Sequence, residues 1–338
     1  MRDVGLQGIG HALWPPGREV PTKIIHCRHC GQKNRVQVPS AVLKSLTWTC
    51  GRCGRALFLG VEEPLTGIES RAYEHDLDRK SLAALKAVPG FPAMVKWIIA
   101  NLGERRVKIH QMSSSIRCSK DQFPELLALL DVARKRLDIQ VNPDLYLSES
   151  PRMNAMVAGV EQPTIIVWSA LLDQLDDQEL LGTFAHELGH VHAGHVLYKT
   201  MARVVVEGTA LLGGYAKLLT IPLRKALLVW DRCSELTADR ASLLATRNLP
   251  AVLSSFLKFA GGHRPGVTRR TTLQMAPFVE QARELARIEA TSWLDAVFAT
   301  LLTMDQSHPY VVWRLMHLVE WVETGSYLEI LAGQYTRK

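Results

Sequence analysis

Residues 182–196, GTFAHELGHVHAGHV, hold four histidines and one glutamate in a segment whose other side chains are mostly small or apolar. On a helix, which turns 100° per residue, His186 and His190 lie one turn apart on the same side, so both imidazoles can share one metal ion. Glu187 lies at the edge of that side, within reach of a water molecule on the ion. This arrangement favours hydrolysis, because zinc lowers the pKa of water and the glutamate accepts its proton.

A catalytic zinc site needs a third protein ligand. On a helical wheel His192 and His195 project away from the pair, so we expect them to be structural or to lie at a cleft rim. The metzincin pattern does not fit, because alanine and valine occupy positions 193 and 196. Downstream, CSELTADRASLLA places Glu235 and Asp239 four residues apart on one helical face. One carboxylate can be the third ligand and the other can fix a histidine tautomer; the alternative is a solvated acidic face.

The elements that position these residues are also visible in the sequence. Asp176 or Asp177 is expected to cap the helix that carries the histidines, with Glu179 in its first turn. Before it, MNAMVAGVEQPTIIVWS predicts a strand, a turn and a strand. Residues 67–150 are expected to be helices broken by short turns, because two segments carry apolar stripes at helical spacing.

Four of the six cysteines, Cys27, Cys30, Cys50 and Cys53, form the pattern C-x2-C-x19-C-x2-C. This spacing is typical of a four-thiolate zinc site, and the glycine after each pair permits the tight turn. A segment of about forty residues cannot build an adequate core alone, so the ion would supply much of its folding free energy. The segment resembles the zinc ribbon that precedes some bacterial thioredoxins, although no thioredoxin-like active-site segment follows it.

The positive charge of the chain is concentrated around these cysteines. The chain has 40 Lys and Arg against 33 Asp and Glu, a net charge of +7. Residues 20–61 contain no acid and seven basic residues, which equal the whole excess: Lys23, Arg28, Lys33, Arg35, Lys44, Arg52 and Arg55. We therefore expect this segment to dock onto an acidic partner; the alternative is a ribbon that only folds and links.

Four motifs, NAMVAG, HELGHVHAGH, ELTADR and HPYVVWR, occur in the order found in a known family of zinc metallopeptidases. The chain resembles this family, which includes the HtpX heat-shock proteases and the CAAX prenyl endopeptidases, over most of residues 70–320. The resemblance implies zinc on His186, His190 and Glu235, with Glu187 as the base and Asp239 supporting the ligands.

The same resemblance implies roles for residues outside the helical motifs. His308 would stabilise the oxyanion, and Arg314 would pair with the acidic motif. Asn154, Ala155 and Met156 would form a strand edge that pairs with the extended backbone of the substrate.

One segment departs from the family, which usually carries transmembrane helices. Residues 202–230 are interrupted by Glu207 and Lys217, which leaves no run of about twenty apolar residues. Arg203, Glu207, Ala210, Gly214 and Lys217 share one face of a helical wheel, which predicts an amphipathic helix on a surface. Residues 203–223 are expected to cover the cleft, form a subunit interface or make peripheral contact with a membrane; spanning ranks below these.

The sequence thus predicts a mainly α fold with a small β-sheet, an α+β zincin-like metallopeptidase with an N-terminal zinc ribbon. The expected boundaries are a flexible tail at 1–22, the zinc ribbon at 23–60 and the metallopeptidase domain at 61–338. That domain divides into an N-terminal helical part, 61–150, and a catalytic core, 151–338.

The predicted function is that of a zinc-dependent endopeptidase acting on proteins or peptides, with two zinc ions per chain, one catalytic and one structural. Paired thiols without a secretion signal favour the cytoplasm, including a peripheral place at the inner face of a membrane. Two alternatives remain: a nucleic-acid-associated protease guided by the ribbon, and a non-enzymatic zinc scaffold. The lone tryptophan of the ribbon disfavours the first, and the intact Glu187 disfavours the second.

Overall fold

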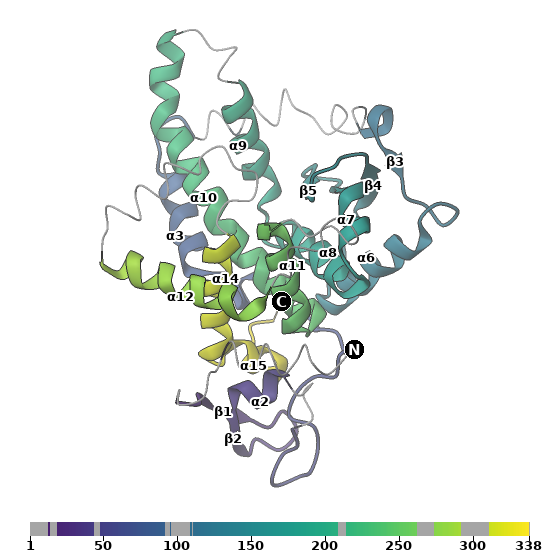
Figure 1. The fold of residues 1–338 in the computed structure, drawn as a ribbon, viewed down its shortest axis with the longest axis vertical. Coiled ribbons are helices and arrows are strands. Elements are labelled where there is room, and N and C mark those ends of the chain that lie inside the picture. Colours follow the sequence, from purple (N-terminus) through teal and green to yellow (C-terminus); the bar gives the residue numbers. More distant parts are fainter. Residues whose placement is uncertain are drawn as a thin grey trace.

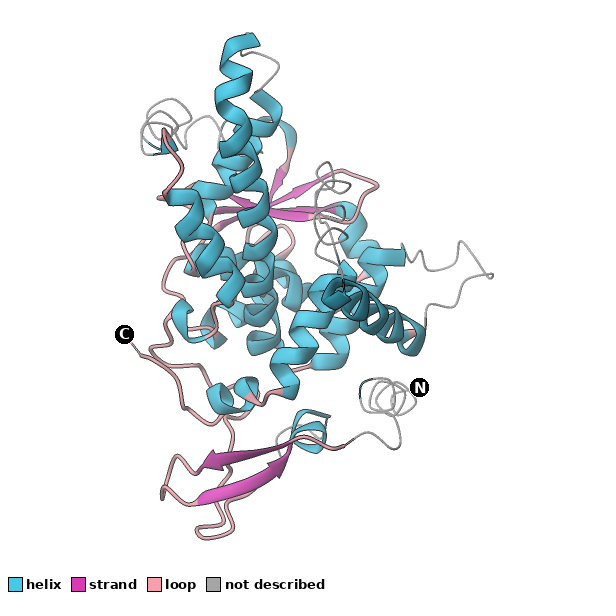
Figure 2. Ribbon diagram, turned by 90° about the vertical axis from the view of Figure 1, so that its left-hand side faces the viewer, coloured by secondary structure: helices cyan, strands magenta, loops and turns pink. Residues whose placement is uncertain are grey.

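The computed structural model describes residues 13, 19–43, 48–91, 95, 109, 111–208, 214–261, 274–291 and 311–337, with only the backbone at 43, 203–208, 214–222, 286 and 289–291. Helices dominate these residues, and the strands form one two-stranded and one four-stranded sheet (Figures 1 and 2). This confirms the predicted fold class, mainly α with a small sheet and a cysteine cluster near the N-terminus.

The first elements belong to the cysteine module: β1 (Thr22–His26), β2 (Lys33–Gln37) and α2 (Val38–Leu43). The remaining elements follow in chain order: a 3-10 turn η1 (Ser70–Ala72), α3 (Asp76–Lys86), β3 (Ile116–Arg117), α6 (Pro124–Arg136), β4 (Asp144–Ser148), β5 (Ala155–Ala158), β6 (Thr164–Trp168), α7 (Ser169–Gln174), α8 (Asp177–His192), α9 (Val196–Gly208), α10 (Gly214–Thr246), α11 (Leu249–Gly261), α12 (Met275–Thr291), α14 (Val311–Glu323) and α15 (Ser326–Leu331).

The four-stranded sheet has the order β3-β4-β6-β5. β5 and β6 pair antiparallel, as the strand, turn and strand prediction required. The prediction of helices alone over residues 67–150 is wrong, because β4 lies there and pairs parallel with β6. Leu145 and Tyr146 of β4 are both buried although they point to opposite faces, so the strand shows no alternation of apolar and polar residues.

Helix α8 runs through the core and crosses α10 at very short distance. It begins at a capping box: the Asp176 side chain accepts from backbone N–H groups of the first turn, and Glu179 accepts from the N–H of Asp176. A Cβ added to Gly189 would lie 2.7 Å from the Cβ of Ala241 and 3.1 Å from the Cα of Ala238, so only glycine permits this approach. The crossing brings the acidic face of α10 against the histidines of α8.

Helix α10 is a single 33-residue helix, and with α9 it extends beyond the rest of the fold (Figure 1). The side chains that form the amphipathic face predicted for 203–223 lie outside the part of the chain that the structure describes. In the part of the chain that the structure describes, no helix combines the length and the apolar character needed to cross a membrane.

The cysteine module packs against the end of the chain. The backbone N–H of Leu59 donates to the carbonyl of Leu331 at 2.7 Å, and the Gln334 side chain donates to the carbonyl of His26 at 2.9 Å. Ile25 and Leu328 are fully buried in one hydrophobic cluster, so the module and the helices share a core. Helix α2 of the module lies beside α15 (Figure 1). The boundary at residue 60 stays a prediction.

The predicted tail, 1–22, falls mostly outside the described residues. Its described residue Leu13 is fully buried, and its carbonyl accepts from Arg283 of α12 at 2.6 Å. At this point the chain is held against the helices.

The helix crossing gives a first prediction. We expect Gly189→Ala to destabilise the fold by about 1–3 kcal/mol, because the new methyl overlaps backbone and Cβ atoms of α10. Gly182→Ala on the same helix is the matched control: its methyl meets only side-chain atoms, the Ser242 hydroxyl at 3.0 Å and the Thr246 methyl at 3.3 Å, and alanine gains about 1 kcal/mol of helix propensity. Denaturant unfolding measures the free energy of unfolding of both variants. Equal losses would show that the close approach at Gly189 does not determine the stability of the fold.

Candidate metal centre

The two histidines of α8 converge with Glu235 of α10 in the protein interior. The Nε2 atoms of His186 and His190 each lie 3.3 Å from a Glu235 carboxylate oxygen. One donor atom of each residue lies within 4.8 Å of the donor atoms of the other two, and all three side chains are buried. Two ring nitrogens and one carboxylate are the donor set of a catalytic zinc site.

The neighbours of this cluster set the charges of its three side chains. The guanidinium of Arg314 and the ammonium of Lys199 outweigh burial and hold the pKa of Glu235 well below its usual range, so the carboxylate is ionised. Burial alone would lower the pKa of His186, but the carboxylates of Asp239 and Glu235 raise it to about 9. Positive charge on the His186 ring is therefore stabilised. Because His190 has its pKa lowered by burial and by Lys199, its ring is neutral and can ligate.

Asp239 and Arg314 support the donors from behind. The Nδ1 of His186 lies 3.0 Å from Asp239 Oδ1, and since a carboxylate only accepts, this contact leaves Nε2 turned toward Glu235. Arg314 of α14 donates to both oxygens of Asp239, at 2.8 and 2.5 Å, and its Nη1 lies 3.2 Å from Glu235. The structure therefore brings together the acidic motif and the arginine that the resemblance assigned to it.

Glu187 lies beside the donors and faces a small cavity of about 40 Å³. The cavity is also lined by His186, Ala155 of β5 and Phe256 of α11. Among the described strands, β5 is the edge of its sheet, and Ala155 and Met156 lie on it, while the carbonyl of Asn154 accepts from Trp168 at 3.0 Å. The predicted substrate strand and the predicted base thus adjoin one space.

His308 lies outside the residues that the structure describes. His192 contacts the Tyr73 hydroxyl through Nδ1 at 2.9 Å, away from the donors. The helical-wheel placement of His195 is wrong, because α8 ends at His192 and Gly194 adopts φ +69°. His195 instead folds back under His190, with 3.1 Å between their Nδ1 atoms.

Lys199 is a neighbour of the centre that the sequence did not indicate. Its ammonium donates to Glu235 at 2.7 Å and to Asp231 at 2.9 Å. These carboxylates outweigh burial and raise the pKa of Lys199, which keeps the side chain charged. No sequence motif marks this lysine, which is the fourth residue of α9. Its contact with Glu235 is visible only once α9 is packed against α10.

The four cysteines form a second cluster near the N-terminus. The sulfur of Cys27 lies 3.7 Å from that of Cys53, and the sulfur of Cys30 lies 3.6 Å from that of Cys50. All four sulfurs lie within 4.8 Å of one another. Backbone N–H groups of the second knuckle lower the pKa of Cys50 to about 6, which favours the thiolate that binds metal. Gly31 and Gly54 adopt positive φ at the two turns, as the motif requires.

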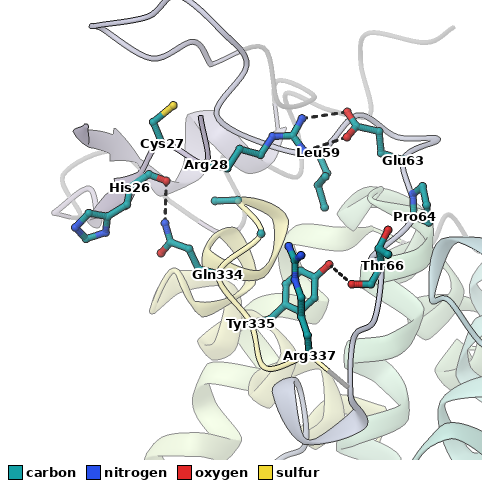
Figure 3. Close-up of a pocket in the computed structure, with 12 residues that line it drawn as sticks. His26, Cys27, Arg28, Leu59, Glu63, Pro64, Thr66, Gln334, Tyr335 and Arg337 are labelled. Carbon is teal, nitrogen blue, oxygen red and sulfur yellow. Dashed lines mark hydrogen bonds and ion pairs between the residues drawn. The ribbon is translucent and has the colours of Figure 1, made fainter. Parts of the chain in front are cut away.

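A pocket of about 560 Å³ lies where the cysteine module meets the C-terminal segment (Figure 3). Arg28 of the module donates to both oxygens of Glu63 at 3.0 and 3.3 Å, and Tyr335 donates to the Thr66 carbonyl (Figure 3). The hydrogen bonds from Arg28 hold the pKa of Glu63 below its usual range. No donor of the histidine cluster lines this pocket, and Arg28 is engaged within the molecule.

Comparison with known proteins gives a consistent result. Residues 121–322 match peptidase family M48. The chain is 30% identical over 266 residues to the chloroplastic plastoglobule-localized metallopeptidase 48 of Arabidopsis thaliana, covering 78% of this chain and 76% of the relative. It is 27% identical over 187 residues to a protease HtpX homolog of Salinibacter ruber, covering 49% of this chain and 67% of the relative. No solved structure gives a significant match.

The buried arginine generates a second prediction. We expect Arg314→Met to lower the free energy of unfolding of the metal-free protein by about 3–5 kcal/mol, because buried Asp239 loses its cation and buried Glu235 loses one of two. Arg117→Met is the control, since its pair with Asp144 is largely exposed on the arginine side and should contribute about 1 kcal/mol or less. Urea titration of both variants tests this. A loss for Arg314→Met no larger than for the control would show that the acidic motif does not need this cation.

Proposed function

This chain belongs to peptidase family M48 and is a zinc-dependent protease, and we propose that His186, His190 and Glu235 hold its catalytic zinc ion while Glu187 is the general base. The convergence of two Nε2 atoms and one carboxylate on one buried position carries this proposal. The adjoining cavity, which Glu187 lines, supports the choice of base.

Each residue of the site has a separate task in peptide hydrolysis. Bound zinc supplies Lewis acidity, which lowers the pKa of water and polarises the scissile carbonyl. The Glu187 carboxylate accepts the proton of the attacking water and then delivers it to the leaving nitrogen. Among the described strands β5 lies at an edge of its sheet, and we propose that this edge, with Asn154, Ala155 and Met156, aligns the substrate backbone as an added strand. His308 stabilises the oxyanion in this proposal, on the strength of the motif HPYVVWR.

The proposed metal content is two zinc ions per chain, with the second held by Cys27, Cys30, Cys50 and Cys53. The four sulfurs support this, because they approach one another closely and two of them, those of Cys27 and Cys50, accept backbone N–H groups, as in thiolate knuckles. The ion would stabilise the module, whose own core is small.

Substitutions at the two sites give a third prediction. Glu187→Gln should retain two zinc ions and the fold but lower cleavage of an unstructured peptide by about 10²–10⁴-fold, because the attacking water loses its base. Glu235→Ala should lose one zinc ion, and Cys27→Ser the other. Elemental analysis and peptide cleavage measure these effects, with Glu161→Gln on an exposed turn as the control. Full activity of purified Glu187→Gln would refute the mechanism. A zinc content of Glu235→Ala equal to that of the unchanged protein would refute the ligand set.

We also propose that the cysteine module docks onto an acidic protein surface. Arg28 and Lys23 pair with Glu63 and Glu329, so they contribute little outward charge. Three exposed basic residues remain around a groove of about 600 Å³ that Trp48 also lines: Lys33, Arg35 and Arg52. Their charge complements an acidic segment. A nucleic acid is less favoured, because Trp48 is the single aromatic side chain lining this groove.

The groove gives a fourth prediction. Replacing Lys33, Arg35 and Arg52 together by Gln should leave short-peptide cleavage unchanged but weaken selection of native targets, measured by comparing cleaved proteins with those of the parent enzyme. The control removes equal charge elsewhere, at the exposed residues Arg71, Lys80 and Lys120. Unchanged target selection in the groove variant would refute docking. Salt-dependent loss of RNA or DNA binding by the groove variant would favour the nucleic-acid alternative.

The place of the protein in the cell is also a proposal. Paired thiols suited to zinc support a reducing compartment, and we assign the protein to the cytoplasm. The alternating charges and apolar residues of 203–223 support a peripheral contact at the inner face of a membrane.

A further inference from the structure

A buried carboxylate outside the proposed ligand set, Asp78 of α3, accepts contacts from three directions. Trp230 Nε1 donates to its Oδ1 at 3.0 Å, and Thr237 Oγ1 donates to its Oδ2 at 2.5 Å. His195 Nε2 lies 3.1 Å from the same Oδ2. Asp78 is fully buried, and an ionised carboxylate is tolerated there only because donors surround it.

The direction of the hydrogen bonds at Asp78 is fixed by its neighbours. Thr237 Oγ1 already accepts the backbone N–H of His75 at 3.1 Å, so its own hydrogen is directed to Asp78. The indole nitrogen of Trp230 only donates. These donors, with His195, outweigh burial and keep the pKa of Asp78 below its usual range. The carboxylate is therefore an acceptor toward His195.

His195 connects this carboxylate to a proposed zinc ligand. Its Nδ1 lies 3.1 Å from Nδ1 of His190, and both rings are 1% exposed. When Nε2 of His190 faces the metal, the ring proton must be on Nδ1 and is donated to His195. His195 can accept it only if its own proton is on Nε2, which then donates to Asp78. One tautomer of each ring satisfies every contact.

We propose that Asp78 and His195 are positioning residues that fix the tautomer and orientation of His190 for zinc binding. The two ligating histidines are then supported in different ways. Asp239 of α10 contacts His186 directly, whereas Asp78 acts on His190 through an intervening imidazole. Loss of such a supporting contact typically weakens metal binding by about 10–100-fold.

The proposal gives α3 a place in the metal centre. Asp78 precedes residues 121–322, the part of the chain that matches the family, while Trp230 and Thr237 lie on α10 within it. Helix α3 packs along α10, and His75, which caps α3, stacks edge-on against His317 of α14 at 4.9 Å. The N-terminal helical part therefore completes the support of a ligand carried by the catalytic core.

The experiment is a zinc titration of the full-length chain against a chromophoric chelator. Asp78→Asn keeps the shape but removes the charge, and it should weaken the histidine-site zinc by about 10–100-fold while the cysteine-bound zinc stays unchanged as an internal control. Raising the zinc concentration should restore peptide cleavage, which a merely misfolded variant would not show. Tyr73→Phe is the matched control, because it removes the contact to His192 without reaching a ligand.

Two further measurements separate positioning from general destabilisation. In ¹⁵N-histidine spectra of the zinc-bound protein, Asp78→Asn should shift the Nδ1 signal of His190, whereas Tyr73→Phe should not. His195→Asn should also weaken zinc binding. Adding Asp78→Asn to it should lower the zinc affinity little further, because the series of contacts from Asp78 through His195 to His190 is already interrupted. The His195 variant also tests the proposal if Asp78→Asn fails to fold.

The outcomes distinguish this proposal from the proposed ligand set on which it rests. Wild-type zinc affinity in folded Asp78→Asn and His195→Asn would overturn the positioning role, as would equal weakening of both zinc sites. If Glu235→Ala retains the histidine-site zinc, the ligand set itself is wrong. If Glu235→Ala loses that zinc while Asp78→Asn keeps it, the ligand set stands and only the positioning role fails.

Discussion

The architecture depends on one contact, the crossing of α8 and α10 at Gly189, where the absence of a side chain lets α10 come within van der Waals distance. The histidines and the carboxylates are carried by two separate helices, so the spacing of these helices sets every distance in the centre. A helix pair separated by ordinary side chains has axes about 8–10 Å apart. Side chains as short as Glu235 and Asp239 reach the imidazoles because the crossing is this close, and the sheet and the outer helices hold it in place.

Charge balance is the second constraint, because the centre holds several buried ionised groups. Glu235 and Asp239 are matched by Arg314 and Lys199, which come from α14 and α9. Each cation lies on a different element from the carboxylates, so the elements cannot separate without exposing unpaired charge to a poorly solvating interior. The same groups that stabilise the ionised ligand therefore also lock the orientation of four helices around it.

The sequence predicted the parts of the site that depend on local spacing. His186 and His190 share a face because helical periodicity is local, and the capping box at Asp176 follows the same logic. His195 was misplaced because the wheel was continued past Gly194, although glycine there is a helix stop. Asp78 gave no signal, since an acid in the first turn of a helix is ordinary and its partners Trp230 and Thr237 lie 152 and 159 residues away. Contacts of that range follow from topology, which a single sequence does not display.

The packing of the cysteine module on the end of the chain bears on how the protein is made. Lys23 contacts the carbonyl of Thr324, 301 residues later, and His26 is contacted by Gln334, 308 residues later. During translation the module is therefore made about 300 residues before its docking surface on α15 and the segment after it. Zinc uptake by the thiolates can precede synthesis of that surface, whereas closure of the shared core requires it and forms contacts of high contact order. A protease assembled in this order closes its shared core only after the helices that carry the metal centre, α8 and α10, have been made.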